Sequence, residues 1–155
     1  MIFLPICINI TDKKILIIGG GKTAAHKLKT LLMFTNNIVA LAPEISDKIK
    51  KSGIEIIKKQ YSENFLNDFY LIYACTDNSK LNLQIKSDAN KLGKLVNICD
   101  SPANCDFTSP AIFKQQNMSV AVSSNARDVK KSIKWRDEIK KHLTTTCPEA
   151  EGTRG

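Results

Sequence analysis

The feature that most constrains the fold is a glycine turn that directly follows a short apolar run. Residues 15–18 read Ile-Leu-Ile-Ile, and the chain continues with the pattern Gly19-x-Gly21-x-x-Ala24. In the dinucleotide fingerprint, the first glycine permits a tight turn and the second lets a pyrophosphate approach the backbone. The third small residue lets a helix pack on the strand. The start of that helix holds phosphates through its amides and its positive dipole end. We therefore expect an NAD-type cofactor here, because an apolar strand precedes the turn and an amphipathic helix follows it.

The first two thirds of the chain alternate apolar strands with helices. Strands are expected at 13–20, 38–43, 54–57, 69–76 and 94–99, and helices at 22–33, 45–51 and about 81–92. This alternation predicts a parallel sheet with right-handed crossovers. We interpret residues 1–106 as an α/β, Rossmann-like, NAD-binding domain. Ligands of such sheets collect at the carboxyl ends of the strands. The segments 19–21, 42–44, 75–77 and 97–100 should therefore surround one crevice.

The pattern changes after residue 106. Two short strands, 111–114 and 118–122, precede a helix over 128–143 whose broad apolar arc has Trp135 at its edge. A strand pair and one helix are too few to form a core of their own. Residues 107–143 are therefore expected to act in dimerisation and substrate binding, as part of a homodimer. The alternative is that they fold back on their own nucleotide domain. The polar residues 144–155 are expected to form a flexible tail.

Composition restricts the function classes. The chain has 155 residues, 43% of them hydrophobic, and a net charge of +8. No apolar run approaches the roughly 18 residues of a membrane span, so we expect no membrane partner and a cytoplasmic protein. The five cysteines form no metal pattern with His26 and His142, so no bound metal is expected. The positive charge suits nucleic acid or an anionic small molecule, but no nucleic-acid recognition motif is present, and we expect no nucleic acid.

Four stretches of the chain resemble the precorrin-2 dehydrogenases, which form the N-terminal module of siroheme synthases. They are Leu4-Pro5-Ile6, residues 19–27, Ala74-Cys75-Thr76-Asp77, and Val96–Asp100 together with Cys105-Asp106-Phe107 and Pro110-Ala111-Ile112. The resemblance covers residues 1 to about 143. The sequence departs from the family at His26, where the family usually has arginine, and at Asn125–Val129, where the family usually has Gly-Gly or Asn-Gly and then Lys-Ser-Pro. The second departure leaves substrate handling by that loop open.

The resemblance implies a reaction, which is the NAD-dependent oxidation of precorrin-2 to sirohydrochlorin on the way to siroheme. Precorrin-2 is a tetrapyrrole with many carboxylates, which a basic protein attracts. Some family members also insert ferrous iron, so iron would be a transient substrate here. The short C-terminus leads us to expect weak ferrochelatase activity at most. The rival hypothesis is a non-catalytic NAD-sensing regulatory Rossmann domain, which would not need the motif at 97–100.

Asp100 is the expected catalytic residue, since a carboxylate beside the nicotinamide can accept a substrate proton as hydride leaves. Its alternative role is a turn cap before Ser101. Asp77 is expected to cap the following helix, with a cofactor or substrate contact as the alternative.

Glu44 can bond a ribose hydroxyl and favour NAD over NADP, or be the first-turn acid of the next helix. The nearby Lys48, Lys50 and Lys51 could instead admit a 2′-phosphate, so the preference stays open. The other expected cofactor-binding residues are Gly19, Gly21, Lys22, Thr23, Pro43 and Thr76. The expected substrate-binding residues are Asn97, Lys114, Ser123, Ser124 and Arg127, although the two serines could simply end a strand.

Overall fold

The computed structural model describes residues 1–146, which belong to two compact units. The first unit spans Phe3–Thr108, and the second begins at Ser109. The boundary lies two residues beyond the predicted one, because Phe107 belongs with the first unit. Its ring meets that of Tyr73 edge-on, with the centroids 5.4 Å apart. Its carbonyl also accepts a hydrogen bond from Asn97.

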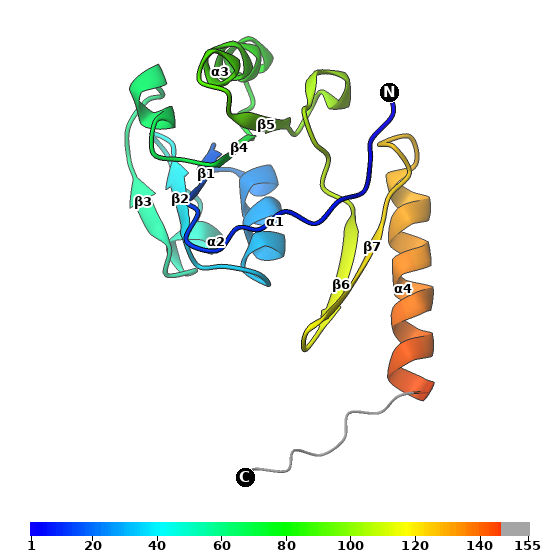
Figure 1. Cartoon of the computed structure of the whole chain (residues 1–155). Coiled ribbons are helices and arrows are strands. Elements are labelled where there is room, and N and C mark those ends of the chain that lie inside the picture. Colours follow the sequence, from blue (N-terminus) through cyan, green and yellow to red (C-terminus); the bar gives the residue numbers. More distant parts are fainter. Residues whose placement is uncertain (147–155) are drawn as a thin grey trace. The chain divides into compact units, whose positions relative to one another are not determined.

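The first unit is built on a five-stranded parallel sheet with the order β3-β2-β1-β4-β5 (Figure 1). The strands are β1 (Ile15–Ile18), β2 (Ile38–Leu41), β3 (Glu55–Ile57), β4 (Leu71–Ala74) and β5 (Leu95–Ile98). The helices are α1 (Lys22–Leu31), α2 (Asp47–Lys50) and α3 (Ser79–Lys91), with two 3-10 turns that the sequence did not predict, η1 (Glu63–Leu66) and η2 (Pro102–Asn104). The predicted Rossmann-like sheet is confirmed. Its strands are shorter than the apolar runs, which continue beyond the last paired residue.

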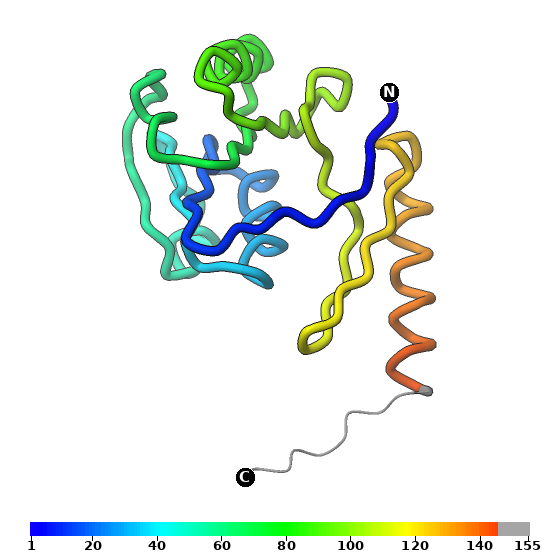
Figure 2. The backbone as a smooth tube through the Cα atoms, viewed as in Figure 1, coloured from blue at the N-terminus to red at the C-terminus, as the bar shows by residue number. Residues whose placement is uncertain are grey.

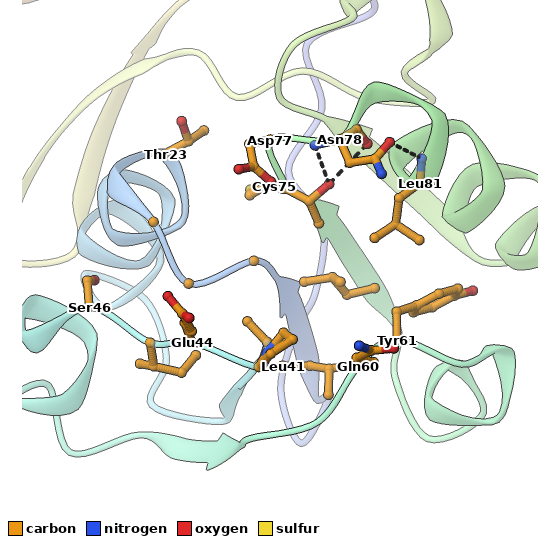
Figure 3. A pocket seen from close by; sticks show the side chains of 18 of the residues that line it. Thr23, Leu41, Glu44, Ser46, Gln60, Tyr61, Cys75, Asp77, Asn78 and Leu81 are labelled. Carbon is orange, nitrogen blue, oxygen red and sulfur yellow. Dashed lines mark hydrogen bonds between the residues drawn. The ribbon is translucent and has the colours of Figure 1, made fainter.

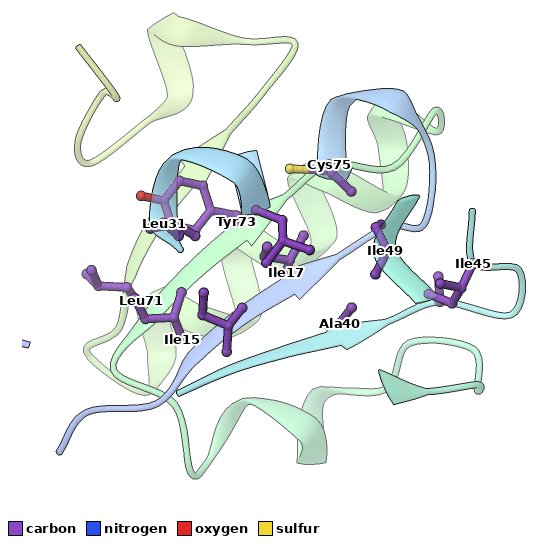
Figure 4. Close-up of a cluster of buried hydrophobic side chains, with 13 residues drawn as sticks. Ile15, Ile17, Leu31, Ala40, Ile45, Ile49, Leu71, Tyr73 and Cys75 are labelled. Carbon is purple, nitrogen blue, oxygen red and sulfur yellow. The ribbon is translucent and has the colours of Figure 1, made fainter. Parts of the chain in front are cut away.

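Helices cover both faces of this sheet, which explains why its strands read as continuous apolar runs. Successive side chains of a strand point to opposite faces. Ile15 and Ile17 of β1 therefore pack with α1 and α2 (Figure 4). Leu16 and Ile18 pack on the other face with α3 and η1. The chain runs outward from β1 through β2 and β3, then returns to β4 on the opposite side of β1. The point where the strand order reverses lies beside the carboxyl end of β1, where sheets of this kind bind ligands.

The second unit is an antiparallel hairpin with one long helix. The hairpin consists of β6 (Ala111–Gln115) and β7 (Met118–Val122), and the helix α4 (Val129–Thr146) lies along it (Figure 2). The guanidinium of Arg136 donates to the carbonyl of Ile112 at 3.3 Å, which ties α4 to the hairpin.

The first three residues of the predicted tail are helical. The hydroxyls of Thr144 and Thr145 donate to carbonyls of the preceding turn and continue α4. Residues 147–155, the rest of the predicted tail, lie outside the described residues. Between residues 1 and 146, no helix combines the length and apolarity needed to cross a membrane.

Candidate functional site

A pocket of about 890 Å³ opens at the carboxyl edge of the sheet, where β1, β2 and β4 end (Figure 3). This volume is typical of a small-molecule site. Three of the four segments that were predicted to surround one crevice contribute to its wall. The lining residues are 18–23, 41–46 and 75–78, together with Gln60, Tyr61 and Leu81. All seven residues predicted to bind cofactor are in its wall. The fourth segment, 97–100, is not in this wall; it follows β5, which lies beyond β4 on the side away from the glycine turn.

The three glycines of the turn meet different steric requirements. Gly19 has φ +131°, and a Cβ built on it would lie 2.4 Å from the carbonyl oxygen of Cys75. A Cβ on Gly20 would lie 1.8 Å from the carbonyl oxygen of Glu44. A Cβ on Gly21 would meet nothing within 4 Å. Packing therefore requires Gly19 and Gly20, whereas Gly21 keeps the pocket open. The fingerprint leaves position 20 unspecified, so sequence reasoning missed Gly20.

Helix α1 begins at this turn without a side-chain cap. Gly21 is its N-cap, and its first turn contains no acidic residue. In contrast, Asn78 caps α3 by accepting a hydrogen bond from the Leu81 amide at 3.1 Å. The first amides of a helix need an acceptor, and an anion at that end satisfies them. Lys22 and Thr23 line the pocket at the same place. The start of α1 therefore fits the pyrophosphate of a dinucleotide.

The loop after β2 forms the second wall, and it contains Glu44. Helix α2 starts only at Asp47, which is the acid of its first turn. Glu44 therefore does not have the alternative role of helix-start acid. Its carboxylate lies in the pocket wall, where Figure 3 shows it, and is exposed. Lys50 pairs with Asp47 at 3.0 Å. Neither Lys48 nor Lys50 lines the pocket, and the same is true of Lys51.

Ser46 is a further pocket residue that the sequence did not single out. Its amide donates to the carbonyl of Gly20 at 2.9 Å, so this loop and the glycine turn are bonded to each other. Its hydroxyl is buried and has no hydrogen-bond partner within the described part of the chain. A buried hydroxyl without a partner in a pocket wall fits a site that takes a polar ligand.

The third wall follows β4. Thr76 donates its hydroxyl to Oδ1 of Asn82 at 2.7 Å, and its amide donates to the same oxygen at 3.2 Å. Asp77 lines the pocket, but it is not the helix cap that we expected, because Asn78 has that role. This leaves the Asp77 carboxylate at the pocket wall.

Asp100 lies just beyond β5, and residues of α3 hold its carboxylate. Oδ2 accepts from the hydroxyl of Ser79 at 2.7 Å, and Oδ1 accepts from the amide of Asn82 at 3.0 Å. Both bonds come from another element, so the carboxylate does not have the predicted alternative role of capping the turn before Ser101. Asp100 is exposed, which leaves part of the carboxylate open to a ligand.

Two cysteines meet at the ends of β4 and β5. Cys75 and Cys99 follow Ala74 and Ile98, which are partners in the strand register, and their sulfur atoms lie 2.7 Å apart. The hydrogen bond with Cys99 and burial raise the pKa of the Cys75 thiol, whereas the same bond lowers the pKa of Cys99. This pair was not predicted from the sequence, although the equal positions of the two residues at strand ends were a usable signal. Among residues 1–146, no group of three histidine, cysteine or acidic residues could hold a metal ion.

The residues predicted to bind substrate lie in different surroundings. Asn97 is only 4% exposed, and its amide donates to the Phe107 carbonyl at 2.8 Å. This bond connects β5 to the segment that follows it. A substrate contact by Asn97 stays a prediction.

The other four predicted substrate residues lie in the second unit, Lys114 in β6 and the other three in the segment between β7 and α4. The hydroxyl of Ser124 accepts from the Asp128 amide at 3.0 Å, and that of Ser123 accepts from the Asn125 amide at 3.4 Å. Asn125 and Ala126 have φ of +53° and +59°, a region that favours glycine. The departure from the resembled family therefore falls where the backbone favours the glycine that the family usually has. Substrate contacts by the serines, Lys114 and Arg127 stay predictions.

The chain is similar to known proteins over most of its described length. A family model described as putative NAD(P)-binding matches residues 6–111. Siroheme synthase of Psychrobacter cryohalolentis is 37% identical over 127 residues, which cover 79% of this chain and 24% of that protein. Siroheme synthase of Nitrosococcus oceani is 33% identical over 159 residues, which cover 100% of this chain and 33% of that protein. This chain thus spans at most about a third of these two relatives.

Among solved structures, SirC, a precorrin-2 dehydrogenase, has the same fold. It matches with a TM-score of 0.77 and 22% identity, over 95% of this chain and 72% of its own. The resemblance seen in the sequence motifs is therefore confirmed. The chain belongs to the family of putative NAD(P)-binding proteins that the matching model describes.

Proposed function

We propose that this protein oxidises precorrin-2 to sirohydrochlorin with NAD. The observation that carries the proposal is the connection of the glycine-turn pocket to Asp100 through Asn82, which hydrogen-bonds to Thr76 in the pocket wall and to the Asp100 carboxylate. A pure NAD sensor has no need for a carboxylate held beside its pocket. The names of the relatives and the net charge of +8, which suits an anionic ring, support the choice of substrate.

Each part of the pocket has a proposed task. The first amides of α1, with Lys22, hold the pyrophosphate, and the Glu44 carboxylate accepts hydrogen bonds from ribose hydroxyls, which favours NAD over NADP. NAD supplies the hydride acceptor when it is bound. The oxidation removes a hydride and a proton from the tetrapyrrole, and the exposed Asp100 carboxylate accepts the proton. Ferrous iron would be a transient substrate of weak chelation at most.

The assembly and the substrate contacts are part of the same proposal. We propose a cytoplasmic homodimer joined through the second unit, because α4 has four exposed large apolar side chains. They are Val129, Ile133, Trp135 and Ile139, at 62%, 41%, 51% and 37% exposure. The polar and basic side chains around β6 and the turn before α4 would bind substrate carboxylates. They are Lys114, Ser123, Ser124 and Arg127.

Turnover tests the proposed function directly. Purified protein with NAD and precorrin-2 is expected to form NADH and to shift the visible spectrum of the tetrapyrrole to that of sirohydrochlorin. Asp100→Ala is expected to lose about two to four orders of magnitude in turnover, the usual scale for a general base. Its affinity for NAD in calorimetry should stay unchanged. NAD binding without turnover in the unmodified protein would instead favour a sensor, and near-normal turnover of Asp100→Ala would remove Asp100 from the reaction.

A further inference from the structure

We propose that Ser79 and Asn82, in the first turn of α3, are positioning residues that hold the Asp100 carboxylate for proton transfer. This inference rests on the proposed function, because it needs Asp100 to accept a substrate proton. It assigns a task to a polar network that the dinucleotide fingerprint does not include.

The amide of Asn82 uses its whole hydrogen-bonding capacity. The side chain is 1% exposed. Its oxygen accepts from the amide and the hydroxyl of Thr76 at 3.2 and 2.7 Å. Its nitrogen donates to the Thr76 carbonyl at 3.1 Å and to Asp100 at 3.0 Å. Rotating the amide by half a turn would place its oxygen against a carbonyl and a carboxylate, so only one orientation is stable.

Ser79 supplies the second donor. Its hydroxyl lies 2.7 Å from Oδ2 of Asp100, while Asn82 bonds Oδ1. Each carboxylate oxygen therefore has one donor, and the carboxylate cannot rotate without losing both charge-assisted bonds. A carboxylate oxygen accepts more than one hydrogen bond, so both oxygens keep a free lone pair for a substrate proton. The two donors orient Asp100 without blocking it.

Asn82 also links Asp100 to the cofactor pocket. It bonds three atoms of Thr76, which is part of the pocket wall, and one atom of Asp100. One buried side chain thus fixes how far the proton acceptor lies from that wall. A displacement of about 1 Å in such a geometry can cost roughly a hundredfold in rate. The bond from Ser79 therefore affects the reaction rate and leaves cofactor affinity unchanged, because Ser79 bonds Asp100 and not Thr76.

Ser79 gives the cleaner test, because it is exposed and its side chain bonds only Asp100 among the contacts described. Ser79→Ala is expected to lower kcat about tenfold, with unchanged KM for NAD and unchanged thermal unfolding. Ser79→Thr keeps the hydroxyl and should restore most of the rate. Ser87→Ala, an exposed serine of the same helix, is the matched control and should change nothing. Asn82→Asp retains the size but replaces the donor with a carboxylate facing Asp100, and should lower kcat further.

A double-mutant cycle shows whether Ser79 acts through Asp100. In the Asp100→Ala background, Ser79→Ala should have no further effect on turnover. The inference is overturned if kcat is unchanged in Ser79→Ala. It is also overturned if Ser79→Ala lowers kcat equally in the unmodified protein and in Asp100→Ala.

A readout without turnover separates the inference from the proposed function. In ¹³C-labelled protein, the Asp100 carboxyl resonance should move in Ser79→Ala and stay in Ser87→Ala. If the protein is inactive but the resonance still moves in Ser79→Ala, the hydrogen bond from Ser79 to Asp100 is present and the proposed function is wrong. The bond then has no catalytic task. An unmoved resonance in Ser79→Ala would contradict the hydrogen bond between Ser79 and Asp100 itself.

Discussion

Gly20 and Gly21 are neighbours in the turn, but they are needed for opposite reasons. The space beside Gly20 is occupied by the Glu44 carbonyl, which is backbone and cannot rotate away. The space beside Gly21 is empty, and the pocket begins there. Gly20 therefore serves the fold, and we propose that Gly21 serves the ligand.

This difference predicts two distinct phenotypes. Gly20→Ala should lower the free energy of unfolding by roughly 3 kcal/mol, the upper range for overpacking. Gly21→Val should lower the free energy of unfolding by only about 1 kcal/mol, because valine is a poorer N-cap than glycine, but NAD affinity should fall sharply. Urea unfolding and calorimetric titration measure the two effects. Normal NAD affinity in Gly21→Val would refute the assignment of this turn to the pyrophosphate.

At the scale of elements, Asp88 ties α3 to the segment after β3. It is 4% exposed and accepts hydrogen bonds from the Tyr61 hydroxyl at 3.0 Å and from Gln84 at 3.0 Å. Lys91 contacts it at 2.9 Å. The hydrogen bond from Gln84, followed by that from Lys91, lowers the pKa of Asp88. Because Tyr61 lines the pocket, this buried carboxylate also supports the pocket wall.

Asp88 is expected to make stability depend on acid pH. Its pKa is lower in the folded chain than the value near 4 of an unfolded chain. Its contribution is therefore complete above about pH 4 and is lost as the pH falls through the lower folded value. Asp88→Asn should cost about 1–3 kcal/mol at pH 7. The difference in the free energy of unfolding between Asp88→Asn and the unmodified protein, measured by urea unfolding, should become smaller below pH 4. An equal difference at pH 7 and pH 3 would show that the charge of Asp88 contributes nothing.

At the scale of the whole molecule, the exposed apolar side chains of α4 raise the question of assembly. The apolar arc of α4, defined by Val129, Ile133, Trp135 and Ile139, is exposed along the helix. A two-fold interface would cover the same patch on both copies. Sedimentation at micromolar protein is expected to show a dimer. Ile133→Glu should shift it to monomer, and Lys141→Glu, on the opposite side of the helix, should not. A monomer that turns over at the full rate would exclude the dimer as the working form.

The sequence predicts the parts of this molecule that depend on local patterns. The apolar runs and the glycine fingerprint were enough for the sheet and for seven residues of the pocket wall. Gly20 and Asn82 escaped prediction because their importance comes from segments distant in the chain. The same holds for the contact between Cys75 and Cys99. The burial of Asn97 could not be predicted either, since it depends on the later segment around Phe107, whose carbonyl accepts its hydrogen bond.

The bond between the glycine turn and the loop after β2 has a consequence for evolution. The Gly20 carbonyl accepts the Ser46 amide, and the Glu44 carbonyl fills the space beside Gly20. The main chain at position 44 is thus locked by its neighbour, while the side chain extends freely. Under the proposed role of Glu44, a substitution at this one position can weaken the preference for NAD over NADP during evolution, with no rebuilding of the backbone that presents the side chain.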